Sequence, residues 1–310
     1  MSANVESMFY VRTTPWHGLG TRVEEALTSE DALHYSGLDW TVRQEPLMTG
    51  TFLDIPNLKA NIRNDNNRIL GIVSDSYKVV QNDEAFAFTD ALIGEGVRYE
   101  TAGSLDGGRK VWLLAKLPER YQLAGEDVDP YIVFTNTHDG SGAIKVAPTP
   151  VRVVCQNTLN LALNTAKRSW STKHTSSVHS RLDEARNTLL FADKYMKSLQ
   201  EEAERLSMQR VTDKMFMNLV NKLLPLEDDV SEIAKANNTK LRSDLINRYF
   251  YAPDLEVLPK NAWRAINAVA DFATHAQPLR KTENYQENLF DKVINGHPLT
   301  DKAMKLLAAA

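Results

Sequence analysis

The chain has 310 residues, of which 43% are hydrophobic and 25% are charged, and its formal net charge is −4. This composition is that of a folded globular protein long enough for two compact domains. No apolar run approaches the roughly 20 residues needed to cross a bilayer, and the N-terminus lacks the pattern of a secretory signal. The single cysteine, Cys155, excludes an internal disulfide and fits a reducing compartment. We therefore expect a cytoplasmic protein without a membrane partner.

The first half of the chain is rich in β-forming runs separated by turn residues. Asn61–Val73 predicts two strands around a turn at Asn64–Asn67, and Ser76–Val80 predicts a further strand. Asn82 is a good N-cap residue and Gly94 a stop signal, which together predict a short helix. This part of the chain therefore mixes strands with one helix.

Two β-hairpins are expected next along the chain. In the first, a turn at Asp106–Gly108 joins strands at Val97–Leu105 and Arg109–Leu117. In the second, a turn at His138–Gly142 joins strands at Tyr131–Thr137 and Ala143–Val154. Turns this short require antiparallel pairing. Because Pro148 and Pro150 cannot donate to a ladder, the last strand is expected to be an edge strand or to carry a bulge.

The second half of the chain is helical. Apolar residues recur at spacings of three and four from Leu182 to Leu206, which predicts a long amphipathic helix. Further helices are predicted at Asp213–Leu224, Asp229–Tyr251, Lys260–His275, Asn284–Ile294 and Thr300–Leu307. We expect an α+β protein, with an antiparallel sheet and one or two packed helices in residues 1–168, a Ser/Thr-rich loop or linker at 169–180, and a helical domain at 181–310.

Positive charge is concentrated in one segment. Ser141–Leu182 contains six Lys or Arg residues and no Asp or Glu, whereas the rest of the chain has a net charge of −10. Average composition would place roughly five acids in a window of this length. An acidic protein with such a segment is expected to meet a polyanion there, and nucleic acid is the commonest one.

The expected contact residues follow from this segment. Within a predicted helix at Gln156–Arg168, amides and bases lie opposite an apolar face, and Trp170 among bases suits the stacking of a single strand. The set is Lys145, Arg152, Asn160, Asn164, Lys167, Arg168, Trp170, Lys173 and Arg181, with Arg109 and Lys110 extending the same groove. The alternative is a solvated helix end, where bases complement the helix dipole and Trp170 packs into the core.

An enzymatic alternative places Cys155 as a nucleophile, His138 or His174 as its base and Asp139 as the orienting carboxylate. A cysteine that follows an apolar strand is more often buried and inert. The spacing of His174 and His179 suits no standard zinc site, and no phosphate-binding or dinucleotide-binding glycine motif is present. The sequence therefore predicts neither a metal nor a cofactor, and an enzyme is the less favoured interpretation.

Three segments resemble a family of phage- and plasmid-borne proteins, catalogued as domain of unknown function 932. They are PWHGLGT at Pro15–Thr21, TPVRVVCQNTLNLAL at Thr149–Leu163 and AWRAINAVADFATH at Ala262–His275. The resemblance implies a mobile-element protein of a bacterial host cell, often found among DNA-metabolism genes. It implies no reaction and no catalytic residue.

The order helix, hairpin, hairpin, helix from Asn82 to Arg168 is also similar to the core of single-strand annealing proteins of the Red-beta type. That similarity implies a basic groove along a sheet and an oligomeric assembly. The leading hypothesis is an accessory protein of phage or plasmid DNA metabolism that binds single-stranded DNA, or RNA, without sequence specificity and acts as a homo-oligomer. The other interpretation left open is a module that docks on an acidic host protein.

Overall fold

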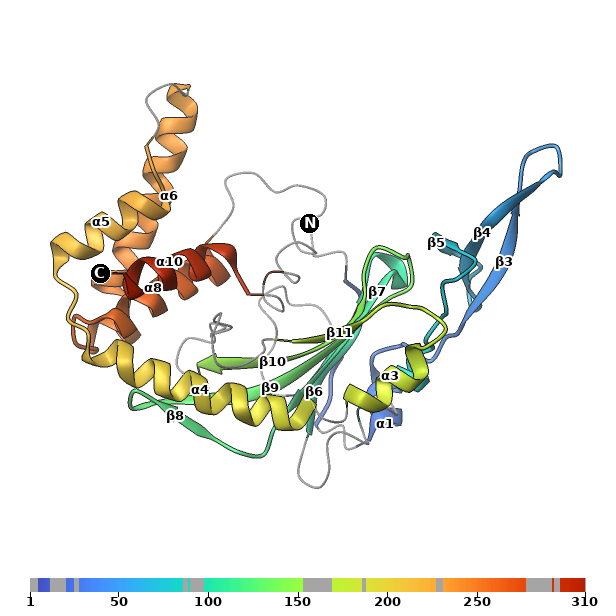
Figure 1. Ribbon diagram of the computed structural model, residues 1–310, viewed down its shortest axis with the longest axis horizontal. Coiled ribbons are helices and arrows are strands. Elements are labelled where there is room, and N and C mark those ends of the chain that lie inside the picture. The colour runs from blue at the N-terminus through green and yellow to red at the C-terminus, as the bar shows by residue number, and fades with distance from the viewer. Residues whose placement is uncertain are drawn as a thin grey trace. The chain divides into compact units, whose positions relative to one another are not determined.

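The computed structural model describes residues 5–11, 21–24, 28–85, 89, 98–152, 169–185, 188–226, 231–276, 292 and 296–309. It contains two compact units. The sheet unit comprises Met1–Pro118, Tyr131–Pro148 and Ser169–Ala192, and the helical unit comprises Glu119–Pro130, Thr149–Arg168 and Asp193–Ala310. The predicted α+β class is confirmed, with sheets rich in antiparallel pairs and a helical C-terminal region (Figure 1). The sequence predicted domain boundaries at residues 168 and 181. Whether the two predicted domains fold independently stays a prediction.

Among the described residues, the larger sheet has eight strands. They are β1 (Val5–Tyr10), β2 (Thr21–Arg22), β6 (Arg98–Leu105), β7 (Lys110–Lys116), β8 (Tyr121–Leu123), β9 (Glu126–Thr137), β10 (Ile144–Arg152) and β11 (Trp170–Thr172). Their order is β11-β10-β9-β7-β6-β1-β2, and β8 pairs with β9. β1 and β2 are parallel, whereas β6, β7 and β9 form antiparallel ladders. Consecutive antiparallel strands follow from the short connections that the sequence provides.

The first predicted hairpin is confirmed. β6 and β7 pair from Arg98↔Lys116 to Leu105↔Lys110 around a short 3₁₀ turn at Asp106–Gly108. Gly107 and Gly108 have φ angles of 68° and 93°, a left-handed conformation that glycine adopts without steric cost. The sequence Asp-Gly-Gly therefore reverses the chain at the end where β7 begins.

One face of this sheet holds the core of the sheet unit. Val111, Leu113 and Phe134 are nearly fully buried on it. Helix α1 (Ser29–Tyr35) contributes Ala32 to the same core. Thr28 caps this helix by accepting the Asp31 N–H, which satisfies one of the free donors of the first turn.

A second, three-stranded sheet has the order β3-β4-β5. Its strands are β3 (Val42–Met48), β4 (Asp54–Arg63) and β5 (Ile69–Ser74). The predicted turn at Asn64–Asn67 lies between β4 and β5 and is confirmed, whereas β3 was not predicted. The strand predicted at Ser76–Val80 is wrong: this segment carries no ladder, although Tyr77 and Val80 are buried.

The Ser/Thr-rich segment at 169–180 contributes to the sheet unit. β11 pairs with β10 as Ile144↔Thr172, Lys145↔Ser171 and Val146↔Trp170. His174 is buried just after it, and helix α3 (Val178–Ala185) follows. Pro148 lies beyond the three residues of β10 that pair with β11. A proline is tolerated at such a position because the ladder with β11 does not need its N–H.

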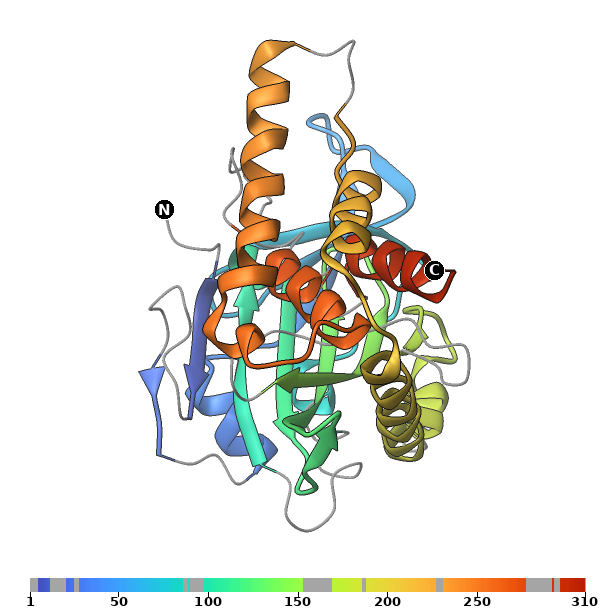
Figure 2. The same cartoon turned by 90° about the vertical axis from the view of Figure 1, so that its left-hand side faces the viewer.

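The described helices of the helical unit are α4 (Thr188–Met208, from Asp193 onward), α5 (Asp213–Leu223), α6 (Glu232–Tyr251), α7 (Pro253–Glu256), α8 (Ala262–His275) and α10 (Pro298–Ala308). All of them except the short α7 lie where a helix was predicted. The predicted apolar stripe is buried in α4 at Met196, Leu199, Ala203 and Leu206. α8 packs against α6 and α10 (Figure 2). The helix predicted at Asn284–Ile294 lies outside the described residues except at Lys292.

Candidate nucleic-acid interface

The predicted interface residues fall into two groups. Four of them lie outside the described residues: Asn160, Asn164, Lys167 and Arg168. Cys155 lies outside them as well. Arg152 ends β10, and its backbone alone is described. The remaining six residues all belong to the sheet unit: Lys145, Trp170, Lys173, Arg181, Arg109 and Lys110.

Four bases from neighbouring strands lie at one end of the larger sheet. Lys110 opens β7 and pairs with Thr137, the last residue of β9. Lys145 lies at the start of β10, and Lys173 directly follows β11. Arg109 precedes β7, and its carbonyl accepts the His138 N–H at 2.7 Å. We call Arg109, Lys110, Lys145 and Lys173 the basic end of the sheet; with about 4.8 Å between strands, it extends across roughly 14 Å.

The exposure of these four side chains differs. Arg109 and Lys173 are exposed, whereas Lys110 and Lys145 are partly buried. The Arg109 guanidinium pairs with the Asp106 carboxylate at 3.1 Å, so its charge is compensated locally.

Trp170 does not lie on the same side of the sheet as Lys145. Its partner in the register is Val146, which belongs to the buried core, and Trp170 itself packs partly buried against that core. Lys145 pairs with Ser171, and successive side chains of a strand point to opposite faces. Trp170 therefore packs toward the core, as expected from the alternative interpretation of the sequence, in which it does not stack on a nucleic acid. Arg181 is exposed on α3.

The face of the sheet opposite the core carries further bases. Arg98, Lys110 and Lys116 occupy paired positions on this face, and Glu100 falls at the irregularity of β6 between Tyr99 and Thr101. The Lys116 ammonium lies 5.8 Å from the centre of the Tyr131 ring. Lys116 is only 9% exposed, so the more accessible of these three bases are Arg98 and Lys110.

Lys116 was missed at the sequence level, although a signal for it exists. Val111, Leu113 and Ala115 alternate with Lys110, Trp112, Leu114 and Lys116. This alternation is typical of a strand with two different faces. The first set forms an apolar face, and the second set, which begins and ends with a lysine, forms a basic one. The basic window alone could not reveal Lys116, because that residue lies outside it.

The loop at the basic end is held by a buried polar junction. His138 is fully buried, its Nε2 lies 2.9 Å from Asn82 Oδ1, and its ring meets Trp40 edge-on at 5.4 Å. Since the Asn82 amide group donates to the carbonyls of Leu38 and Trp40, its Oδ1 is the acceptor and His138 Nε2 carries the proton. The predicted helix is present, since residues 82–85 are helical, but Asn82 lies inside it and its side-chain oxygen binds His138, so the predicted capping role of Asn82 is wrong.

The three-stranded sheet also contributes to this junction. Asn61 Nδ2 donates to the His138 carbonyl at 2.7 Å, and the Tyr77 hydroxyl donates to the Thr137 carbonyl at 2.5 Å. The Tyr77 ring stacks on His174 with centres 4.4 Å apart, and His174 Nδ1 bonds the Lys78 carbonyl. Among the described residues, His138 Nδ1 and His174 Nε2 are buried without a hydrogen-bond partner.

These contacts give His138 a different role from the one in the enzymatic alternative. Its partner is Asn82, whereas Asp139 Oδ1 accepts the Ser141 N–H at 2.8 Å. Burial, and secondarily the nearby His174, lower the pKa of His138 to about 3, which keeps the imidazole neutral. Because Cys155 lies outside the described residues, the enzymatic alternative stays a hypothesis.

We expect His138 to make the protein sensitive to mild acid. Below pH 6.5 the unfolded chain binds a proton at this position, whereas the folded chain binds it only near pH 3, so stability falls as the pH falls through this window. One such group changes the free energy of unfolding by up to about 1.4 kcal/mol per pH unit. Urea unfolding between pH 6 and pH 5 measures this slope.

His138→Gln should reduce that slope by up to about 1.4 kcal/mol per pH unit relative to the unsubstituted chain. His34→Gln makes the same substitution at an exposed histidine of the same unit and serves as the comparison. An unaltered slope in the His138 variant would show that this imidazole is not buried neutral.

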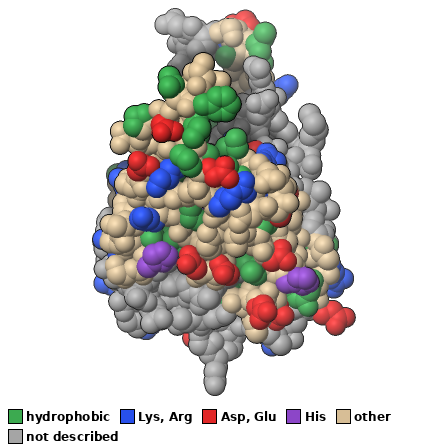
Figure 3. Space-filling model, turned by 90° about the vertical axis from the view of Figure 1, so that its right-hand side faces the viewer, with side chains coloured by type: hydrophobic (Ala, Val, Ile, Leu, Met, Phe, Trp, Pro, Cys, Tyr) green, Lys and Arg blue, Asp and Glu red, His purple; other side chains and the backbone are tan. Residues whose placement is uncertain are grey.

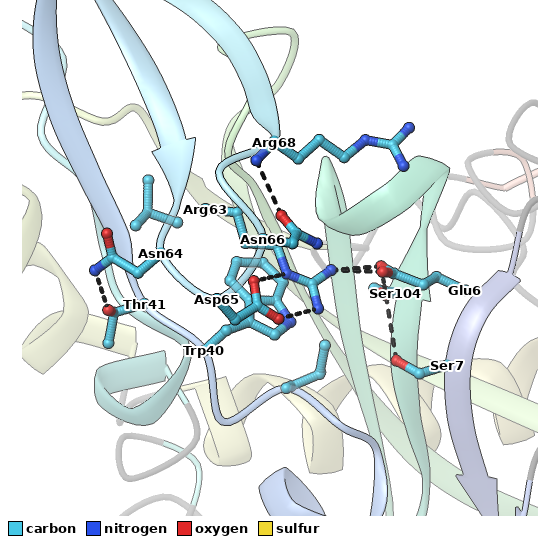
Figure 4. A network of polar contacts seen from close by, with 12 residues as sticks. Glu6, Ser7, Trp40, Thr41, Arg63, Asn64, Asp65, Asn66, Arg68 and Ser104 are labelled. Atoms are coloured by element: carbon cyan, nitrogen blue, oxygen red, sulfur yellow. Dashed lines mark hydrogen bonds and ion pairs between the residues drawn. The ribbon is translucent and has the colours of Figure 1, made fainter.

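A second polar network holds the start of the three-stranded sheet against β1. The Arg63 guanidinium lies between the carboxylates of Glu6 and Asp65, with nitrogen–oxygen distances of 2.7 Å to each, and over the Trp40 ring at 4.4 Å (Figure 4). Ser104 donates to Glu6 at 3.1 Å. Arg63 therefore links β4 to β1 through charge-assisted bonds.

The described residues contain no group of three or more His, Cys, Asp and Glu side chains placed to hold a metal ion. In that same part of the chain, no helix has both the length and the apolar character needed to span a bilayer.

Comparison with known proteins gives one match. No curated protein and no solved structure shows significant similarity to the chain. The family model described as domain of unknown function (DUF932) matches residues 69–294, which include the second hairpin, the basic window and most of the helical unit. Since the match covers well over half of the sequence, the chain belongs to this family of unknown function.

Proposed function

We propose that this protein binds single-stranded DNA without sequence specificity, as an accessory protein of phage or plasmid DNA metabolism. In this proposal the phosphates meet the basic end of the sheet and the acid-free window Ser141–Leu182, which contributes Lys145 and Lys173 to that end. The protein acts as a homo-oligomer, and the annealing of complementary strands is the activity that such binding would serve.

The observation that carries the proposal is the convergence of lysines from three strands. Lys110, Lys145 and Lys173 come from positions up to 63 residues apart in the sequence, yet β7, β9, β10 and β11 bring them to one end of the sheet. Lysines bind phosphate as point charges and read no base, which suits binding without sequence preference. The whole chain is acidic, so this charge is local and not a general property of the surface.

Salt dependence tests the proposal most directly. If four to six bases neutralise phosphates, log K for a labelled oligo-thymidine should fall against log salt with a slope of about −3 to −4. Fluorescence anisotropy at several salt concentrations measures the slope. A lack of binding at low salt would remove the proposal. Oligo-uridine in the same assay shows whether RNA binds equally well.

The triple variant Lys110→Ala, Lys145→Ala, Lys173→Ala should make the slope about 2 units shallower, since each lost phosphate contact on a single strand contributes about 0.7. The control removes three exposed lysines of the helical unit, Lys214, Lys240 and Lys302, so both triple variants change the net charge equally. Equal slopes for the two triple variants would contradict binding at the basic end.

A further inference from the structure

Exposed apolar side chains gather on the three-stranded sheet. Of the described residues in this sheet, Leu58, Ile69 and Ile72 are exposed along β4 and β5. The turn and strand ends of the β3–β4 hairpin add Phe52, Leu53 and Ile55, and Figure 3 shows hydrophobic side chains grouped on this side of the molecule. We call these six residues the arm face.

The strand registers explain why they share a surface. Ile72 pairs with Ala60 and Ile69 with Ile62, so their side chains lie on one face of the sheet. The intervening residues Asn61 and Val73 point to the other face, where they are buried. β5 pairs only with Leu58–Ile62, so the hairpin continues beyond β5 toward its turn (Figure 1). The arm face therefore runs along an extended hairpin.

Phe52 at the turn shows that this exposure is specified by the structure. Its ring is 85% exposed, and its φ angle of 62° is strained for an aromatic residue. The turn is fixed by the Phe52 N–H to the Thr49 carbonyl at 2.9 Å and by the Thr49 N–H to the Leu53 carbonyl at 2.8 Å. A strained and exposed aromatic ring that the turn holds in place is typical of a contact residue.

The size of the arm face matches one side of a protein–protein interface. Its six residues expose roughly 600 Å², taking about 180 Å² for a large apolar residue when fully exposed. The largest apolar patch of a typical monomer is about 300–600 Å², and a standard interface buries about 800 Å² on each partner. The arm face is therefore as large as the largest patches of monomers and supplies most of one side of a standard interface.

The charges beside the arm face favour a second copy of this chain. Arg43 and Glu45 pair with Ile62 and Ala60 on this face and neutralise each other at 2.7 Å. A neutral surface attracts neither nucleic acid nor an anionic membrane. In a twofold contact the same surface meets itself, so the Arg43 of each copy can face the Glu45 of the other.

The edges of the sheet favour contact between faces over pairing between strands. Pro46 in the edge strand β3 has no N–H to donate to an added strand. The loop that follows β9 covers the face of β5 opposite Ile72, because a Cβ on Gly71 would be 2.5 Å from the Asp139 Cα, so the arm face is the face of β5 left for a partner. We infer that two copies of this chain form a twofold dimer by packing their arm faces together. This inference names the surface of the proposed oligomer and does not depend on nucleic-acid binding.

Light scattering coupled to size exclusion tests the dimer on the full chain without nucleic acid. The chain has a mass of 34.9 kDa, and we expect a concentration-dependent rise to twice that value. Ile72→Asp should raise the dissociation constant on the order of 100-fold or more, because the twofold contact would bury two unpaired carboxylates. Ile233→Asp makes the same change at an exposed isoleucine of the helical unit and should leave the dimer intact.

Phe52→Asp gives a second, independent readout, with Tyr251→Asp as the matched control at an exposed aromatic residue of the helical unit. Both positions are exposed, so circular dichroism should show the fold of the unsubstituted chain. A monomer at submillimolar concentration, or a dimer that survives both Ile72→Asp and Phe52→Asp, would overturn the inference. So would binding of the monomer to phosphatidylcholine vesicles that Phe52→Asp abolishes, since the arm face would then be a lipid contact.

Discussion

Arg264→Met should lower the free energy of unfolding by about 4 kcal/mol, the largest effect that we expect from a single substitution. Arg264 lies in α8 and is 4% exposed. Its guanidinium donates to the carbonyls of Tyr249, Glu256 and Leu258 at 2.6 to 3.2 Å. These carbonyls end α6 and follow α7, where no helical N–H remains to satisfy them, so the substitution leaves several buried acceptors unpaired.

Chemical unfolding followed by circular dichroism measures this loss, and hydrogen exchange in α6 and α8 locates it in the helical unit. Arg205→Met provides the control: its ion pair with Glu202 in α4 is largely exposed and should be worth under about 1 kcal/mol. If both substitutions lower the free energy of unfolding by the same amount, the carbonyls around Arg264 must find other donors when the guanidinium is removed.

Arg63→Met should destabilise the sheet unit by about 3 kcal/mol. The side chain is 8% exposed and bonds two carboxylates, Glu6 of β1 and Asp65 of the β4–β5 turn. Methionine fills much of the same volume over Trp40 but leaves both carboxylates without a counter-charge. Loss of stability should appear as faster hydrogen exchange in β4 and β1.

A double variant distinguishes lost charge pairing from lost packing. Glu6→Gln combined with Arg63→Met should be more stable than Arg63→Met alone, because it removes one of the unpaired charges. Arg109→Met, at a more exposed pair with Asp106 in the same unit, should cost under about 1 kcal/mol. A double variant less stable than Arg63→Met would show that packing over Trp40 dominates.

Local patterns were sufficient for elements whose signal is contained in a few neighbouring residues. Asp106–Gly108 predicted its hairpin, because glycine alone adopts the left-handed turn at low cost. The apolar stripe that ends at Leu206 predicted α4, because burial on one helix face repeats every three or four residues.

The missed features depend on partners that are distant in the sequence. Asn82 looks like a helix cap by itself, but its amide is bound to Leu38, Trp40 and His138, which no local pattern reveals. β3 was missed because Pro46 interrupts it and its outward side chains are not uniformly polar.

The same limit applies to the candidate interface. The composition of the window indicated a polyanion partner and included Lys145 and Lys173. It could not show that Trp170 pairs with Val146 and therefore faces the core. Nor could it add Lys116, which lies outside the window and is indicated only by the alternation of side chains along β7.

The contact between Gly71 and Asp139 has a consequence for regulation. β5 presents Ile72 on the arm face, and its backbone at Gly71 leaves no room beside the loop that leads into Lys145. A shift of β5 must therefore displace that loop. If self-association over Ile72 moves this strand, it changes the affinity for a ligand at Lys145, and thermodynamic reciprocity requires the ligand to change self-association by the same factor.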